Sequence, residues 1–223
     1  IAGSSSKNIF GVFFEKFSEI DYFKKYSEFK DAEANILSYS LKLQGESLNP
    51  EHSQLLSRLM ASLRNSAMSA KSIKDIKHNL DEFMNSSNDT VHETYECIVR
   101  CFEKIYKKLI KQLDPQSSIL FEELASLLNE AEDGYLEFIE RMNGHIRNEH
   151  ISKKHIPSLF NANGEIYNSN RLIIFSIGDA WLGPLQASDL QQVPHRKLIT
   201  LNLDGEGLNG DSVLNRNSDN YES

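Results

Sequence analysis

Long hydrophobic runs are missing from this sequence of 223 residues. No stretch approaches the roughly 20 consecutive apolar residues that span a bilayer, and no charged segment leads into an apolar core as in a signal peptide. We therefore predict that the chain as given is soluble. It begins at Ile1 rather than at a methionine, and we expect it to be part of a longer protein.

Positive charge is also in short supply, with 24 basic against 32 acidic residues and a formal net charge of −8. A basic surface supplies most of the affinity of proteins for nucleic acid, and basic clusters bind anionic lipid surfaces. The acidic balance therefore predicts no nucleic-acid partner and disfavours adsorption to an anionic membrane surface.

Cysteine is nearly absent, and the two cysteines, Cys97 and Cys101, are one helical turn apart. A disulfide within one helical turn has poor geometry, and two cysteines without further ligands are a weak metal signal. We interpret both as small side chains at the edge of an apolar stripe, in a chain suited to a reducing compartment.

The motifs that identify common enzymes are missing too. There is no glycine-rich phosphate loop, nucleophile elbow or metalloprotease helix motif. His145, His150 and His155 are spaced by five residues, which on one helix scatters them around the axis. We predict that the chain is not an enzyme.

What the sequence does contain is regular helical spacing of apolar residues, with only five prolines to interrupt it. Gaps of three and four between apolar positions are typical of one face of an α-helix. They predict helices over about 50–84, 91–113, 120–146 and 156–181, the last weakened at Asn161–Gly164. A first segment, 9–44, changes its apolar face near Asp21 and is expected to be kinked or to form two helices.

Short connections between these segments predict the fold class. The connections at residues 45–49, at 85–88 and at Asp114-Pro115 are short, so consecutive helices are expected to be antiparallel neighbours. We predict an all-α, elongated, antiparallel up-and-down bundle over residues 1–184. Residues 185–223 are rich in Gly, Asn, Asp and Ser and are expected to form an irregular, partly disordered tail, with one loosely alternating stretch at 196–203 that is compatible with a lone strand.

Four polar residues in one helix form the predicted functional focus: Lys71, Asp75, His78 and Asn79. The first two are four residues apart, and Asp75 and His78 are three apart, so both pairs are neighbours on a helix surface. One interpretation is a surface ion pair beside a polar layer. The other is a metal or anion site, with Asp75 and His78 as the candidate ligands, since carboxylate-x-x-His pairs hold metals in some helical bundles.

Aromatic residues gather in the first segment, among them Phe10, Phe13, Phe14 and Phe17. One interpretation is that they pack this segment onto the bundle. The other is that they contact a membrane or a membrane-embedded neighbour, where aromatic side chains favour the interface.

Two stretches, 63–83 and 159–171, carry a family resemblance. They are similar, in the same order, to the C-terminal PhoU-like domain of bacterial sodium/phosphate cotransporters, and the resemblance covers about residues 35–183. It implies a domain on the cytoplasmic face of the bacterial inner membrane that regulates phosphate uptake. It also implies an upstream membrane domain, which moves phosphate with sodium, as partner; a homodimer is a second expected assembly.

The resemblance also bears on metal binding. Some PhoU-like domains hold a divalent metal or iron through a Glu-x-x-x-Asp motif, and aligning that motif puts Asp75 on the Asp, Asn79 on a following Asn and Lys71 on the Glu. A charged lysine has donors only and cannot coordinate a cation, so we predict a Lys71–Asp75 ion pair there and assign no cofactor. Two other functions stay open: a free-standing PhoU-type metal-binding regulator of phosphate signalling, and a non-catalytic helical scaffold.

Overall fold

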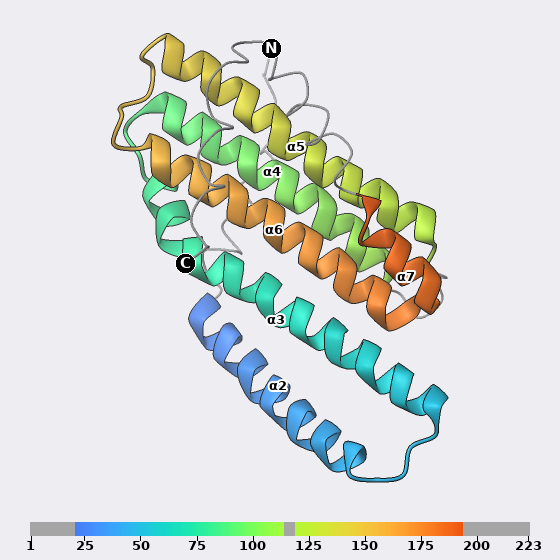
Figure 1. The fold of residues 1–223 in the computed structure, drawn as a ribbon. Helices are drawn as coiled ribbons and strands as arrows, with labels where there is room; N and C mark the ends of the chain where they lie inside the picture. Colours follow the sequence, from blue (N-terminus) through green and yellow to red (C-terminus); the bar gives the residue numbers. More distant parts are fainter. Residues whose placement is uncertain (1–20, 114–118, 194–223) are drawn as a thin grey trace, which may run out of the picture.

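The computed structural model describes residues 21–113 and 119–193, which are coloured in Figure 1. Within these ranges every regular element is an α-helix, which confirms the all-α prediction. The helices are α2 (Tyr22–Gln44), α3 (Pro50–Met84), α4 (Asp89–Gln112), α5 (Phe121–Arg147), α6 (Ile156–Trp181) and α7 (Pro184–Leu190). The expected segment 9–20, the connection at Asp114-Pro115 and the stretch 196–203 lie outside the described residues.

Side-chain caps define three of the helix starts. The Asn49 side chain accepts a hydrogen bond from the backbone of His52, and Pro50 occupies the first turn of α3. Asn88 caps α4 in the same way. Asp21 caps α2 by accepting from the backbone N–H of Lys24, so the expected change of apolar face near this residue coincides with a helix start.

Two helical segments differ from the sequence-based expectation. Helix α6 runs without a break through Asn161–Gly164, because Ala162 and Asn163 are buried and this packing outweighs the weak helix preference of the asparagines and of Gly164. Helix α7 lies where an irregular tail was expected to begin. Pro184 starts it, and Ala187 and Leu190 are buried in the core, which holds this stretch against the other helices.

Helices that follow one another in the chain pack against each other, but the most extensive interface joins α3 and α6, which are far apart in the sequence. Figure 1 shows α3 running alongside α6, and α4 packs against both α3 and α6. The sequence-based prediction took consecutive helices as the main neighbours and did not include this long-range pair. No helix in the described ranges is both long and apolar enough to cross a membrane.

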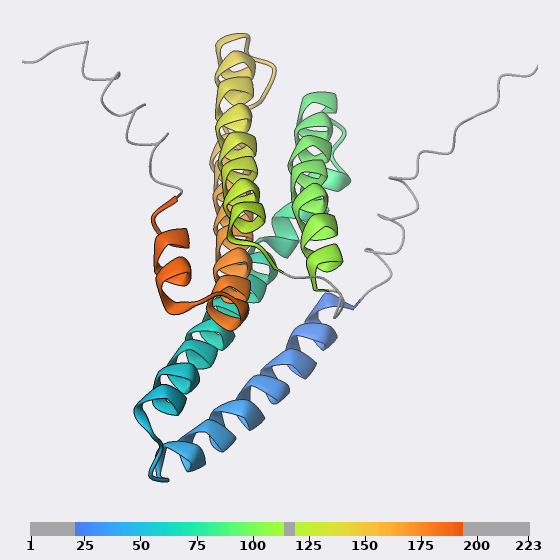
Figure 2. The same cartoon turned by 90° about the vertical axis from the view of Figure 1, so that its right-hand side faces the viewer.

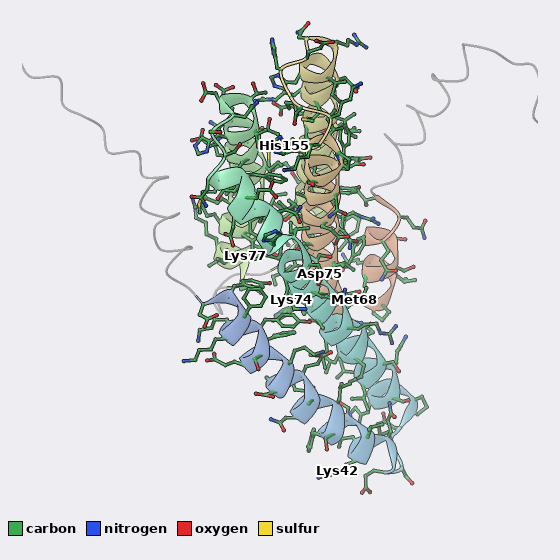
Figure 3. All side chains as sticks on the ribbon, turned by 90° about the vertical axis from the view of Figure 1, so that its left-hand side faces the viewer. Lys42, Met68, Lys74, Asp75, Lys77 and His155 are labelled. Atoms are coloured by element: carbon green, nitrogen blue, oxygen red, sulfur yellow. The ribbon has the colours of Figure 1, made fainter. Side chains whose placement is uncertain are left out.

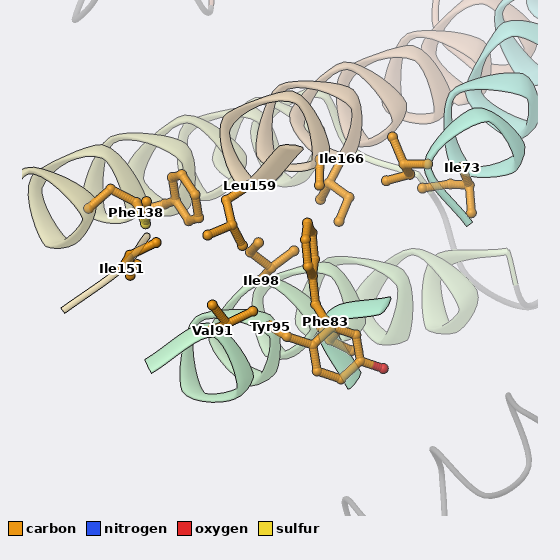
Figure 4. Close-up of a cluster of buried hydrophobic side chains, with 13 residues drawn as sticks. Ile73, Phe83, Val91, Tyr95, Ile98, Phe138, Ile151, Leu159 and Ile166 are labelled. Atoms are coloured by element: carbon orange, nitrogen blue, oxygen red, sulfur yellow. The ribbon is translucent and has the colours of Figure 1, made fainter. Parts of the chain in front are cut away.

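The buried side chains form two apolar clusters, one toward each end of the α4–α5–α6 group. The first, drawn in Figure 4, includes Phe83, Val91, Ile98, Phe138 and Leu159. The second joins α4, α5, α6 and α7. Its large, fully buried members are Ile105, Leu109, Leu124, Leu128, Ile174 and Leu190.

Helix α2 and the start of α3 extend away from these clusters (Figures 2 and 3). We call α2 together with residues 50–59 of α3 the arm. Ser40 is the one buried residue of α2, and residues 50–59 contain none. In the arm, each helix therefore has one side covered by the other helix, and the rest of its surface is largely exposed.

Candidate functional site

The four residues of the predicted polar focus lie at the surface of α3. Lys71 and Asp75 are exposed and form the predicted ion pair, and Lys74 Nζ lies 3.8 Å from the second Asp75 oxygen. The hydrogen bond from Lys71 lowers the pKa of the Asp75 carboxyl. His78 is exposed and Asn79 is half-buried. Figure 3 shows Lys74 and Asp75 on α3 near the level at which α2 begins.

The described helices bring no third ligand to Asp75 and His78. Nowhere in residues 21–113 and 119–193 do three or more His, Cys, Asp or Glu side chains gather closely enough to hold a metal ion. The predicted focus presents the charged side chains of Lys71 and Asp75 at the surface of α3.

The expectation that His145, His150 and His155 scatter is wrong for the first two. Their rings lie 5.9 Å apart, centre to centre. Helix α5 ends at Arg147, and Glu149 has a φ of 56°, so the chain turns back and returns His150 toward His145. His155 lies elsewhere, with Nε2 3.9 Å from a Glu82 oxygen.

A seam of small hydroxyl side chains joins α3 to α6. Ser69 and Ser169 are buried, their hydroxyl oxygens are 2.9 Å apart, and each hydroxyl also donates to the other residue's carbonyl oxygen. Ser62 and Ser66 both hydrogen-bond the Ser176 hydroxyl. Small side chains let two helices approach closely, and the mutual hydrogen bonds satisfy the hydroxyls that this approach buries.

The seam ends in a charged group beside the arm. Asn65 donates to an Asp179 carboxylate oxygen at 2.9 Å, and Arg58 donates to the backbone carbonyls of Asp179 and Leu182. Burial raises the pKa of the Asp179 carboxyl, although Asn65 and Arg58 act in the opposite direction. Arg58 thereby ties the base of the arm to the end of α6.

The sequence analysis did not single out this seam, although its spacing is visible in the sequence. Four of the serines of α3 fall at 62, 66, 69 and 72, and two of the serines of α6 fall at 169 and 176. Gaps of three, four and seven place them on one face of each helix. Small polar residues at that period are a signal for a close helix pair, which attention to large apolar side chains overlooks.

The two cysteines occupy the interface between α4 and α5. Both are free, with Cys97 buried and Cys101 half-buried. Gly134 of α5 faces them so closely that an added Cβ there would lie 3.3 Å from Cys101 Sγ. A hydrogen bond from Cys101 lowers the pKa of the Cys97 thiol, and the nearby Arg141 acts in the same direction.

An apolar groove runs between α3 and α4 and encloses a cavity of about 180 Å³. Two ion pairs, Lys77–Asp81 and Glu103–Lys107, border it. The remaining lining side chains are mostly apolar, and the list comprises Ile73, Leu80, Met84, Tyr95, Val99, Phe102, Tyr106, Ile110 and Ile166. One aromatic ring or a small aliphatic group fits such a space.

The arm presents a second apolar surface. On α2 the side chains of Phe23, Tyr39 and Leu41 are 59, 63 and 68% exposed. Ile36, Leu37, Leu55 and Leu59 add further exposed apolar area on the same pair of helices. Exposed apolar residues that gather on one element mark interaction surfaces more often than single ones do.

These features define a helical protein with two apolar surfaces, and the described residues contain no cluster of metal ligands. Comparison of the chain with protein-family models, with curated proteins and with solved structures finds no match.

Proposed function

We propose that this chain is a regulatory or interaction domain of a sodium-dependent phosphate transporter, with no catalytic turnover of its own. In this proposal it forms an elongated, PhoU-like, antiparallel bundle on the cytoplasmic face of the bacterial inner membrane. The partner is the transporter's membrane domain. The choice of this partner rests on the resemblance of residues 63–83 and 159–171 to the cotransporter family.

The exposed apolar side chains of the arm are the observation that supports an interaction function. A helix of 23 residues in which only Ser40 is buried stays ordered mainly through its contact with α3. Its apolar side chains are exposed, so a partner that covers them removes apolar area from water at about 25 cal/mol per Å². Docking would therefore bury apolar surface of the arm that is now exposed to water, and it would disrupt little existing packing.

A metal-dependent regulator receives less support from the geometry. Lys71 holds the Asp75 carboxylate in an ion pair, and no third metal ligand joins Asp75 and His78 within the described ranges. Stoichiometric iron, zinc or manganese in protein purified without chelators, lost on Asp75→Ala, would favour that function instead.

Binding to the membrane domain tests the proposal. The chain and the sodium/phosphate membrane domain of the same organism are produced separately, and their dissociation constant is measured in detergent or nanodiscs. Leu41→Asp is expected to weaken binding about tenfold or more, since a charge replaces an exposed apolar anchor. The control is Asn35→Asp, an exposed position about 120° around α2 from Leu41.

Equal affinities for the two variants contradict docking through the arm. Hydrolysis or transfer of a phosphate group by the pure chain, lost on Asp75→Ala, contradicts the non-catalytic function. Because Leu41 is already exposed, neither variant is expected to disturb the fold.

A further inference from the structure

The start of α2 lies against α3 close to the groove between α3 and α4. The hydroxyl of Tyr22, the first residue of α2, donates to the carbonyl oxygen of Ala70 at 2.7 Å. The other end of α2 is joined to the start of α3 by residues 45–49, so the two helices run antiparallel. The direction from the C-terminal end of α2 toward Tyr22 is therefore the direction in which α3 runs past Ala70 toward its own C-terminal end.

This register connects the preceding segment to the groove. If the antiparallel register were carried back from Tyr22, residues 9–20 would fall opposite residues 72–83 of α3. The α3 wall of the groove runs from Ile73 to Met84, which is nearly the same stretch. Tyr22 itself packs against the buried cluster that contains Ile73, Tyr95 and Ile166, and all three also line the groove.

The sequence of the segment matches an apolar groove. Phe10, Phe13, Phe14 and Phe17 follow the spacing i, i+3, i+4, i+7 of one helix face. The N-cap at Asp21 separates this stripe from that of α2, so the two need not face the same way. Ile110, at the mouth of the groove, is 66% exposed in the described structure and would be covered by such a stripe.

The size of the cavity also favours a side chain over a free ligand. An apolar cavity of roughly 150 Å³ holds one benzene ring, whereas pockets for small-molecule ligands and cofactors usually measure about 300–1,000 Å³. The cavity of about 180 Å³ therefore suits a single aromatic ring.

We propose that residues 9–20 of this chain dock as an amphipathic helix in the groove between α3 and α4, with a phenylalanine ring in the cavity. The docked segment turns the groove from an exposed surface into part of the core. It also fixes the path of the chain on the N-terminal side of the arm. The inference concerns a different surface from the arm and does not depend on which partner the arm binds.

Hydrogen exchange of the full 223-residue chain, followed by mass spectrometry, tests this docking. Amides of residues 9–20 are expected to exchange slowly in the unaltered chain. Phe17→Asp, at the end of the aromatic stripe nearest α2, is expected to speed their exchange about tenfold to hundredfold, the effect of losing one buried aromatic side chain. Val12→Asp is the matched control, because it makes the same kind of change on the opposite face of the segment.

A second variant probes the groove rather than the segment. Ile110→Asp is expected to release residues 9–20 in the same way. Leu113→Asp, at the exposed residue that directly follows α4 and does not line the groove, is expected to leave them protected. Both positions are exposed in the described structure, so the fold tolerates either change.

Three results would overturn the proposal. Residues 9–20 exchange at the rate of an unprotected peptide, or they are protected only as protein concentration rises, or only when phosphatidylglycerol vesicles are added. The second result assigns the aromatic stripe to another copy of the chain, and the third assigns it to a membrane.

Discussion

The arm and the α3–α6 seam are built from the same helix and show opposite kinds of packing. Where α3 meets α6, serines and apolar residues are buried and every seam hydroxyl named above has a hydrogen-bond partner. Where α3 meets α2, one side of each helix is covered and large apolar side chains remain exposed. Secondary structure alone does not decide how much a helix contributes to stability; the number of neighbours does.

The largest expected effect comes from the core end of α3. Phe83 is fully buried in the first apolar cluster, so Phe83→Ala leaves a cavity and is expected to lower the free energy of unfolding by about 3–5 kcal/mol. Tyr39→Ala in the arm is expected to change it by no more than about 0.5 kcal/mol. Urea unfolding of both variants measures the contrast, and comparable losses would show that the arm is packed as tightly as the core.

The seam is expected to be the next most sensitive region. Ser69→Leu forces a larger side chain between α3 and α6 and removes the Ser69 hydroxyl, which lies 2.9 Å from the Ser169 hydroxyl and donates to the Ser169 carbonyl oxygen. We expect a loss of about 1–3 kcal/mol in the free energy of unfolding. Ser57→Leu makes the same substitution at an exposed position of α3 and serves as control. If the two variants unfold alike, the serine seam is not a close-packed interface.

A smaller effect with a distinct pH dependence is expected at Asp179. Its pKa is raised in the folded state by burial, so the protonated carboxyl is favoured there. Stability from this group is present at low pH and lost as pH rises through the raised pKa. Asp179→Asn mimics the protonated form, and it is expected to match the natural chain near pH 4 and to exceed its stability near pH 7, by up to about 1 kcal/mol.

Thermal unfolding across this pH range checks the sign of that difference. A variant that is less stable than the natural chain at neutral pH would mean that Arg58 and Asn65 outweigh the burial of Asp179.

The smallest effect is expected at the predicted polar focus. Asp75→Asn breaks the exposed pair with Lys71, and ion pairs at the surface contribute little because water and salt screen them. The melting temperature is expected to stay within error of the natural value, with the same result at high salt. A clear loss of stability would place Asp75 in a network that extends beyond α3.

Much of the fold could be predicted from the sequence because local signals determine it. Asn49 with Pro50 marks a helix start by capping chemistry that acts within one turn, and apolar spacing marks the helices that follow. The α3–α6 partnership was missed because it depends on contacts more than 100 residues apart in sequence, such as Ser62 with Ser176. Helix α7 was missed for a similar reason, since burial of Leu190 against distant helices, rather than local preference, holds it.

The candidate site was less predictable than the fold. Spacing placed Lys71 next to Asp75 correctly, because residues four apart on a helix are neighbours. It could not reveal the groove, which exists only where α3 and α4 come together. It also separated His145 from His150, since the turn at Glu149 that reunites them lies beyond the end of the helix.

Hydrogen exchange along α2 and α6 tests the division into core and arm most directly. In the isolated chain we predict that amides of α2 exchange at least about a hundredfold faster than buried amides of α6, since α2 opens without disturbing the apolar clusters. Adding the membrane domain of the transporter is predicted to slow α2 alone. Equal protection of α2 and α6 in the isolated chain would contradict the account, because an arm already locked into the core has no unfilled surface for a partner.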